Sequence, residues 1–142
     1  MSGEGAALAI EGATIGYPGL TVLASATIAI PAGRRVALVG RNGSGKSTLL
    51  RTLAGIQRPL SGRVLCGGQD IDDLSPQARG RRIAYLPQRV SADIPFTVTE
   101  VVLMGRYPHT GMGLFSTAAD RRIAGRGWGG RASRRSPASG AP

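Results

Sequence analysis

Residues 40–47 of the chain read GRNGSGKS, which matches the pattern G-x-x-x-x-G-K-[ST] at every fixed position. The chain has 22 glycines but a single lysine among 142 residues, so its composition predicts only about 0.003 accidental matches. The apolar run RVALV at residues 35–39 precedes the loop, and leucines at helical spacing follow it at 47–54, ahead of Gly55. A strand, a glycine-rich loop and a helix in this order predict an α/β protein that binds a nucleoside triphosphate through a P-loop.

The residue types in this loop fit the chemistry of a phosphate site. Its glycines let successive backbone N–H groups converge on phosphate oxygens, and the following helix begins with the positive end of its dipole. We expect Lys46 to reach the β- and γ-phosphates, Ser47 to offer its hydroxyl to Mg²⁺, and Thr48 to lie near the α-phosphate. The residues of this segment that are predicted to bind the nucleotide are Gly40, Asn42, Gly43, Ser44, Gly45, Lys46, Ser47 and Thr48.

Short strands and helices are predicted on both sides of the loop. A serine and a proline at residues 75–76 predict a helix start, and the pattern Thr97-x-x-Glu100 has the residues of a capping box. A further helix is expected from Ser116 to about Ile123. Apolar runs bounded by turn residues predict strands at residues 6–10, 13–17, 22–30, 63–66 and 83–86, besides the buried one at 35–39.

The positive charge of the chain is concentrated near its C-terminus. The formal net charge is +10, and 6 of the 17 arginines lie in residues 121–142, where no acidic residue occurs. Arg, Gly, Ala, Ser and Pro make up almost all of this segment, which therefore buries too little apolar surface to offset an ordering cost of about 1–2 kcal/mol per residue. We expect residues 1–123 to form the domain and 124–142 to be a disordered basic tail. Because these residue types have G+C-rich codons, the tail also fits an out-of-frame translation.

The composition excludes several classes of site. A single cysteine, Cys66, forms no disulfide framework and no cysteine-based zinc site, and a single histidine, His109, removes most metal-ligand and Ser-His arrangements. No run of about 18 apolar residues is present, so no transmembrane helix is predicted. Residues 1–5 lack the basic start of a secretory signal. These features are typical of a soluble chain in a reducing compartment.

The residues around the loop closely resemble those of one family. The run LVGRNGSGKSTLL at residues 38–50, then LAG at 53–55 and PLSG at 59–62, is similar to the ATP-binding subunits of ABC transporters. The resemblance covers residues 6–123, about the first half of such a domain. It implies an α/β fold with a P-loop NTPase core and an antiparallel β subdomain, here incomplete.

The resemblance assigns roles to two residues outside the loop. Tyr17, ahead of a Pro-Gly turn, occupies the place of the aromatic residue that stacks on adenine; the alternative is an ordinary half-buried tyrosine. Gln88 ends the run YLPQ at residues 85–88, which looks like the family's Q-loop. In that loop the glutamine contacts Mg²⁺ and the attacking water, and it senses the membrane subunit. The implied cofactors are ATP and Mg²⁺.

A third stretch resembles one branch of the family. The run VTEVVLMGRYPH at residues 98–109 is similar to importers of iron–siderophore, haem and cobalamin. This implies transmembrane permease subunits and a second ATPase subunit as partners, a place at the cytoplasmic face of the cell membrane, and no specific nucleic acid. His109 lies too early in the chain for the family's switch histidine and is expected to be a loop residue.

Parts of a complete ATPase site are missing from the sequence. Phosphoryl transfer needs an acidic metal ligand and a residue that positions water, and the family supplies both from an apolar run before Asp-Glu, downstream of an LSGGQ signature. The similar run LCGGQ at residues 65–69 precedes Gln88, so we interpret it as a strand that ends in a glycine turn. We therefore expect the N-terminal part of such a subunit, from a truncated or frameshifted gene, with little ATPase activity of its own.

Three alternatives stay open on the sequence. An arginine- and glycine-rich tail is typical of nucleic-acid binding, which would depend on salt and vanish on deletion of residues 121–142. A P-loop also occurs in kinases and GTPases, against which the placement of Tyr17 and Gln88 counts; competition of ATP with GTP separates these classes. The third alternative is a fragment without function.

Overall fold

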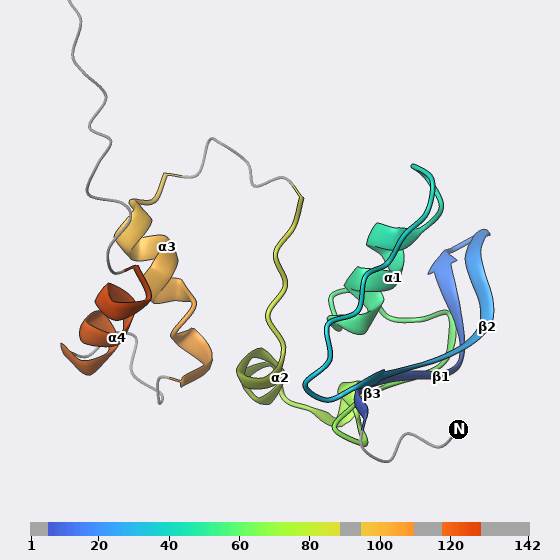
Figure 1. Cartoon of the computed structure of the whole chain (residues 1–142), viewed down its shortest axis with the longest axis horizontal. Coiled ribbons are helices and arrows are strands. Elements are labelled where there is room, and N and C mark those ends of the chain that lie inside the picture. Colours follow the sequence, from blue (N-terminus) through green and yellow to red (C-terminus); the bar gives the residue numbers. More distant parts are fainter. Residues whose placement is uncertain (1–5, 89–94, 110–117, 129–142) are drawn as a thin grey trace, which may run out of the picture. The chain divides into compact units, whose positions relative to one another are not determined.

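The computed structural model of the chain describes residues 6–88, 95–109 and 118–128. These residues divide between two compact units, 1–88 and 89–142. The first unit is built on a β-sheet, whereas the described part of the second is helical (Figure 1).

A four-stranded antiparallel sheet runs through the first unit in the order β2-β1-β3-β4. Pro18 and Gly19 close the hairpin between its first two strands, and Gly19 has the φ of +80° that such a turn requires. The strands are β1 (Ala6–Tyr17), β2 (Leu20–Pro31), β3 (Ser61–Cys66) and β4 (Gln69–Asp70). The predicted antiparallel β subdomain is therefore confirmed.

Strand β1 is continuous where the sequence predicts two strands. Its pairing with β2 shifts register between Ile10 and Ala13, so Glu11 and Gly12 form a bulge. Gly12 has a φ of +53°, a left-handed conformation that glycine adopts without a steric penalty. A bulge absorbs the extra residue while the ladder continues on both sides. The polar Glu11-Gly12 pair thus marks a bulge and not the end of a strand.

The core of the first unit lies between the sheet and helix α1 (Lys46–Leu53). Leu49 and Leu53 project from one face of this helix and pack against side chains of β1 and β3. Five residues are completely or almost completely buried: Ile10, Ala13, Ile15, Thr52 and Val64. Gly55 follows the last helical turn with a φ of +67°, as predicted for the residue that ends this helix.

Helix α2 (Pro76–Arg82) begins where the sequence predicts. Ser75 is its N-cap, and the hydroxyl of Ser75 accepts a hydrogen bond from the Ala78 amide at 3.1 Å. Arg79 of this helix donates to the carbonyl of Gly55 at 3.0 Å. The short 3₁₀ turn η1 (Ile71–Asp73) precedes α2 and buries Ile71 in the core. Helix α2 is thus tied to the C-terminal end of α1.

Two predicted buried strands, at residues 35–39 and 83–86, are wrong for this structure. Both segments belong to neither a strand nor a helix, although both are apolar. Val36 is 63% exposed, Val39 is 90% exposed and Leu86 is 87% exposed. A central strand takes hydrogen bonds from neighbours on both sides and burial from covering helices. Among the described residues no strand pairs with either segment, so their apolar composition does not produce a strand here.

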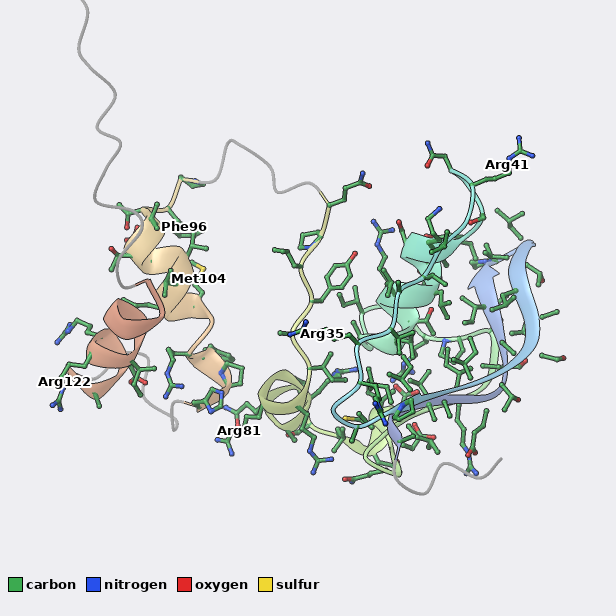
Figure 2. The ribbon with its side chains drawn as sticks, viewed as in Figure 1. Arg35, Arg41, Arg81, Phe96, Met104 and Arg122 are labelled. Carbon is green, nitrogen blue, oxygen red and sulfur yellow. The ribbon has the colours of Figure 1, made fainter. Side chains whose placement is uncertain are left out.

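The described part of the second unit contains α3 (Val98–Met104), η2 (Tyr107–His109) and α4 (Ala118–Trp128). The predicted capping box is confirmed: the Thr97 hydroxyl accepts from the Glu100 amide at 3.3 Å, and the Glu100 carboxylate accepts from the Thr97 amide at 2.7 Å. Arg106 and Asp120 form an ion pair at 3.2 Å between the residues after α3 and helix α4. Figure 2 labels Phe96, which lies two residues before α3, and Met104, which is the last residue of α3.

Helix α4 extends past the end that the sequence predicts near Ile123. Its backbone is helical at residues 124–128, where the composition predicts disorder, although two of these five residues are glycines, which disfavour a helix. The rest of the predicted tail, residues 129–142, and the predicted helix start at Ser116 lie outside the described residues. None of the described helices is long and apolar enough to cross a membrane.

Candidate nucleotide-binding site

The glycines of the loop that joins residues 35–39 to α1 are required by its geometry. Gly43 and Gly45 have φ angles of +80° and +89°, which residues with a side chain rarely adopt. A Cβ atom on Gly45 would overlap the Val22 side chain, and one on Gly40 would lie 2.9 Å from the hydroxyl of Ser44. Backbone conformation therefore favours glycine at positions 43 and 45, whereas at position 40 a side chain would displace only the Ser44 hydroxyl.

The N-terminus of α1 presents backbone donors at the end of this loop. Gly45 is the N-cap and provides no side-chain cap, and the first turn contains no acidic residue. Leu49 is the first amide that bonds back along the helix, to the carbonyl of Gly45 at 2.9 Å. Helix geometry leaves the amides of Lys46, Ser47 and Thr48 without an intrahelical acceptor. Together with the helix dipole, these donors form an anion site.

Lys46 lies against the loop that precedes it. Its ammonium group donates to the carbonyl of Gly40 at 2.7 Å and to the carbonyl of Arg41 at 2.6 Å. Arg41 itself projects from the outer tip of the loop (Figure 2). The positive charge of Lys46 is therefore held beside the free amides of α1, where a phosphate group offers it stronger acceptors than neutral carbonyls.

A cavity of about 810 Å³ gathers most of the predicted site residues. Its volume is within the range of small-molecule sites. Eight of the ten predicted residues line it: Tyr17, Asn42, Gly43, Gly45, Lys46, Ser47, Thr48 and Gln88. The other two residues lie beside this cavity. The carbonyl of Gly40 accepts a hydrogen bond from the Lys46 ammonium group, and Ser44 lines a second, smaller cavity. Segments 17, 42–48 and 88 of the sequence thus meet at one hollow of the first unit.

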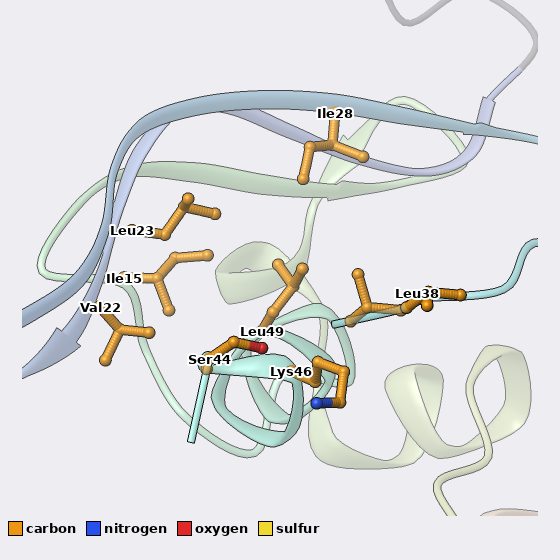
Figure 3. A pocket seen from close by; sticks show the side chains of 10 residues that line it. Ile15, Val22, Leu23, Ile28, Leu38, Ser44, Lys46 and Leu49 are labelled. Atoms are coloured by element: carbon orange, nitrogen blue, oxygen red, sulfur yellow. The ribbon is translucent and has the colours of Figure 1, made fainter. Parts of the chain in front are cut away.

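The second cavity, of about 290 Å³, is apolar and backs the loop. Figure 3 shows it among side chains of the β1–β2 hairpin and α1, with Leu38 and Lys46 to one side. Its aliphatic members are Ile15, Val22, Leu23, Ile28, Leu38, Val39 and Leu49. Val22 and Leu38 also line the larger cavity. Sequence reasoning missed these apolar wall residues, and their signal was only their proximity in the sequence to Tyr17 and to the loop.

The wall around Tyr17 contains a cluster that sequence reasoning also missed. Tyr17 is 41% exposed and faces the larger cavity together with Tyr85. Interactions with the phenol groups of Tyr85 and Tyr17 raise the pKa of Arg51 above its ordinary value. The available signal was helical spacing, since Arg51 follows Ser47 by four residues and so shares its face of α1.

The residues predicted to hold Mg²⁺, Ser47 and Gln88, line the same cavity. The described residues contain no group of three or more His, Cys, Asp or Glu that could hold a metal ion. A hydroxyl and an amide carbonyl are hard oxygen donors, and Mg²⁺ commonly takes one or two protein ligands with water and substrate phosphates in the remaining positions. This donor set therefore fits Mg²⁺ that arrives with a nucleotide.

The run LCGGQ has the structure that the sequence predicts. Leu65 and Cys66 end β3, Gly67 and Gly68 form a turn with φ angles of +59° and +80°, and Gln69 begins β4. None of these residues lines either cavity. This confirms that the run is a strand followed by a glycine turn.

Comparison with known proteins gives consistent relatives. The profile of the family described as ABC transporter matches residues 23–134. The cobalamin import ATP-binding protein BtuD of Halobacterium salinarum is 42% identical over 119 residues, which are 84% of this chain and 29% of that protein. The ferric enterobactin transport ATP-binding protein FepC of Escherichia coli is 42% identical over 99 residues, which are 70% of this chain and 36% of that protein.

Solved structures agree with the sequence relatives. A metal-chelate type ABC transporter in an inward-facing conformation matches 86% of this chain and 43% of its own, with a TM-score of 0.63 and 27% identity. The ATP-binding subunit of another ABC transporter matches 75% of this chain and 44% of its own, with a TM-score of 0.62 and 28% identity. The chain thus spans less than half the length of each of these relatives.

Proposed function

The chain belongs to the ABC transporter family, and from this membership we propose that it binds ATP with Mg²⁺ as the ATP-binding part of an importer. Relatives named for cobalamin, haemin, achromobactin and ferric enterobactin support a metal chelate or a related cofactor as the transported class. The proposal covers the residues that are present, because the chain spans 29% to 37% of the length of these relatives.

One observation carries the proposal: a single cavity is lined by a lysine, the donor end of a helix and an aromatic side chain. In the proposed complex the amides of residues 46–48 and the ammonium group of Lys46 bind the phosphates. Ser47 and Gln88 provide oxygen ligands for Mg²⁺, and Tyr17 stacks on the adenine ring. The bound metal would supply charge neutralisation between the phosphate oxygens.

The proposed partners are transmembrane permease subunits and a second ATP-binding subunit at the cytoplasmic face of the membrane. Support comes from relatives whose names describe ATP-binding proteins of cobalamin and haemin import. The printed sequence has no apolar run followed by Asp-Glu after residue 48. For the residues present we therefore propose nucleotide binding, and we assign none of them to the hydrolytic step, which also needs an acidic metal ligand and a water-positioning residue.

The test is nucleotide binding by the full 142-residue chain, measured by isothermal titration calorimetry with ATP and Mg²⁺. Replacing Lys46 by Ala should weaken ATP binding about tenfold or more, because a charge-assisted contact to the phosphates is lost. Arg58→Ala is the matched control, since Arg58 is an exposed arginine of the same unit outside the cavity. Equal affinities of the Lys46→Ala variant and the parent chain would contradict the proposal.

A further inference from the structure

Val22 lies at an irregularity of the β1–β2 hairpin. Ile15 of β1 pairs with Leu23 of β2. The next residue of β1, Gly16, pairs with Thr21, so Val22 is the extra residue of a bulge in β2. A bulge bends its strand and changes the direction in which a side chain points, and bulges are common beside functional sites. The direction of the Val22 side chain is therefore set by the bulge and not by the regular alternation of the strand.

This side chain packs against the residue that begins α1. A Cβ atom on Gly45 would overlap Cγ1 of Val22 and would lie 3.6 Å from its Cβ. Val22 thus fills the space beside the Gly45 backbone that another residue type would need for its own side chain. In Figure 3 the Val22 side chain points from the hairpin toward the start of α1, where Ser44 is labelled. Val22 lines both the smaller and the larger cavity.

The hydrogen bonds of the glycine-rich loop fix its shape without joining it to the sheet. The Ser44 amide donates to a carbonyl three residues earlier at 3.2 Å, and Lys46 donates to two loop carbonyls. Within the part of the chain that the structure describes, the bonds of this loop stay inside residues 40–49. Gly45 also has no side chain that could cap the helix. Apolar packing, in which Val22 meets the N-cap, therefore holds the loop against the hairpin.

We propose that Val22 is a positioning residue that keeps the first amides of α1 in place for the phosphate chain. The inference rests on the proposed function, since the amides of residues 46–48 are its phosphate donors. Gly45 is the hinge of this arrangement, because glycine populates many backbone conformations and a change in its path turns the amides that follow. Donors that are already oriented lose less conformational entropy when an anion binds. The contribution of Val22 therefore belongs to the phosphate chain, whether or not a nucleoside is attached.

Two ligands test this assignment by isothermal titration calorimetry with the full 142-residue chain. They are MgATP and magnesium tripolyphosphate, which has the phosphate chain without the nucleoside. Val22→Ala should weaken both ligands by the same factor, about threefold to tenfold, because the contact with Gly45 is lost and the amides are less well oriented. Val22→Ile keeps both γ carbons and should bind both ligands as the parent chain does.

Val36→Ala is the matched control, because Val36 is a 63% exposed valine of the same unit that lines neither cavity. Without ligand, the amide NMR signals of Gly45 and the three residues after it should shift or broaden in Val22→Ala and stay unchanged in Val36→Ala. These signals report the orientation of the donors directly, which a general loss of stability would not change in the folded chain.

Three results would overturn the role of Val22 and leave the proposed function intact. The first is weaker binding of ATP alone in Val22→Ala, which would assign Val22 to the nucleoside. The second is unchanged binding of both ligands, and the third is an equal loss of affinity in Val22→Ile. A parent chain that binds neither ligand would instead overturn the proposed function and, with it, this inference.

Discussion

The first unit contains apolar segments that form buried strands and apolar segments that remain unpaired and exposed. Strands β1 and β3 pair with each other and bury their side chains against α1, so Ile15 and Val64 are almost completely hidden from solvent. Segments 35–39 and 83–86 are just as apolar but unpaired, and Val39 and Leu86 are exposed. The difference shows that an apolar run forms a strand only where another segment supplies both backbone partners and a covering surface.

The largest expected effect comes from a close approach between the backbones of β1 and β3 at Gly62. Gly62 has a φ of +76°, and a Cβ atom there would overlap the backbone of Gly12 and Ala13 at the bulge. Gly62→Ala should therefore lower the free energy of unfolding by about 3 kcal/mol or more, because a strained backbone and a clash act together. Urea unfolding followed by far-UV circular dichroism measures this loss.

The control for this prediction is another left-handed glycine with open space around it. Gly67 has a φ of +59° and no atom within 4 Å of its would-be Cβ. Gly67→Ala should cost only the backbone strain, about 1–2 kcal/mol. Equal losses in the two variants would mean that the contact between β1 and β3 is not tight, and would weaken the contrast with the unpaired segments.

A matched pair of valines tests the contrast directly. Val64 is 1% exposed in β3, and Val39 is 90% exposed in an unpaired segment. Val64→Ala should destabilise the chain by about 2 kcal/mol, because two buried methyl groups are lost and a cavity forms. Val39→Ala should change the free energy of unfolding by less than about 0.5 kcal/mol. A comparable loss from both variants in urea unfolding would show that residues 35–39 are packed in solution.

The contrast also explains which features could be predicted from the sequence. Signals that act within a few residues were predicted correctly: the Ser75 and Thr97 caps, the glycine after α1, and the turn at residues 67–68. The strand at residues 35–39 was predicted incorrectly, because a strand needs backbone partners from other segments, and the local sequence does not specify them. The sequence predicts a break in β1 where the structure has a bulge. A Glu-Gly pair between two apolar runs is compatible with either a turn that ends a strand or a bulge within one strand.

The candidate site shows the same division. The glycines, Lys46 and Ser47 belong to one contiguous motif. Its spacing is typical of phosphate binding, so these residues could be predicted from the sequence alone. The resemblance to a family pointed to Tyr17 and Gln88, and both line the cavity. Arg51 escaped notice, because the two tyrosines that interact with it are more than 30 residues away from it in the sequence. Helical spacing predicts which residues are neighbours on the same helix, but it does not predict contacts with other elements.

Helix α3 shows how much local interactions contribute to helix stability when no side chain of the helix is buried. None of its residues is buried, and its start depends on the capping box between Thr97 and Glu100. Thr97→Ala should lower the helix stability by about 1 kcal/mol, because an amide of the first turn loses its acceptor. The change should appear as a loss of helical signal in far-UV circular dichroism, with Thr99→Ala as the control, because Thr99 is the second residue of α3 and is not its N-cap. An equal change from both variants would argue against the cap.

The same box predicts a dependence on pH. Hydrogen bonds from the Thr97 side chain and backbone lower the pKa of Glu100 in the folded chain. A depressed carboxyl pKa contributes stability that is fully present above the ordinary value and is lost as the pH falls through the folded value. Acidification below about pH 4 should therefore reduce the helical signal more in the parent chain than in Glu100→Gln, which does not ionise. Identical acid titrations would exclude this contribution.

The smallest expected effect concerns a charged contact between the two paired strands. Arg63 of β3 and Glu11 of the β1 bulge form an ion pair at 2.8 Å, and their side chains are 61% and 32% exposed. Solvent screens such a pair, so a double-mutant cycle with Arg63→Met and Glu11→Gln should give a coupling of about 0.5 kcal/mol. A coupling well above 1 kcal/mol would mean that charge helps to choose the partner of β1. A small coupling leaves that choice to burial and backbone fit, which are the two things that residues 35–39 lack here.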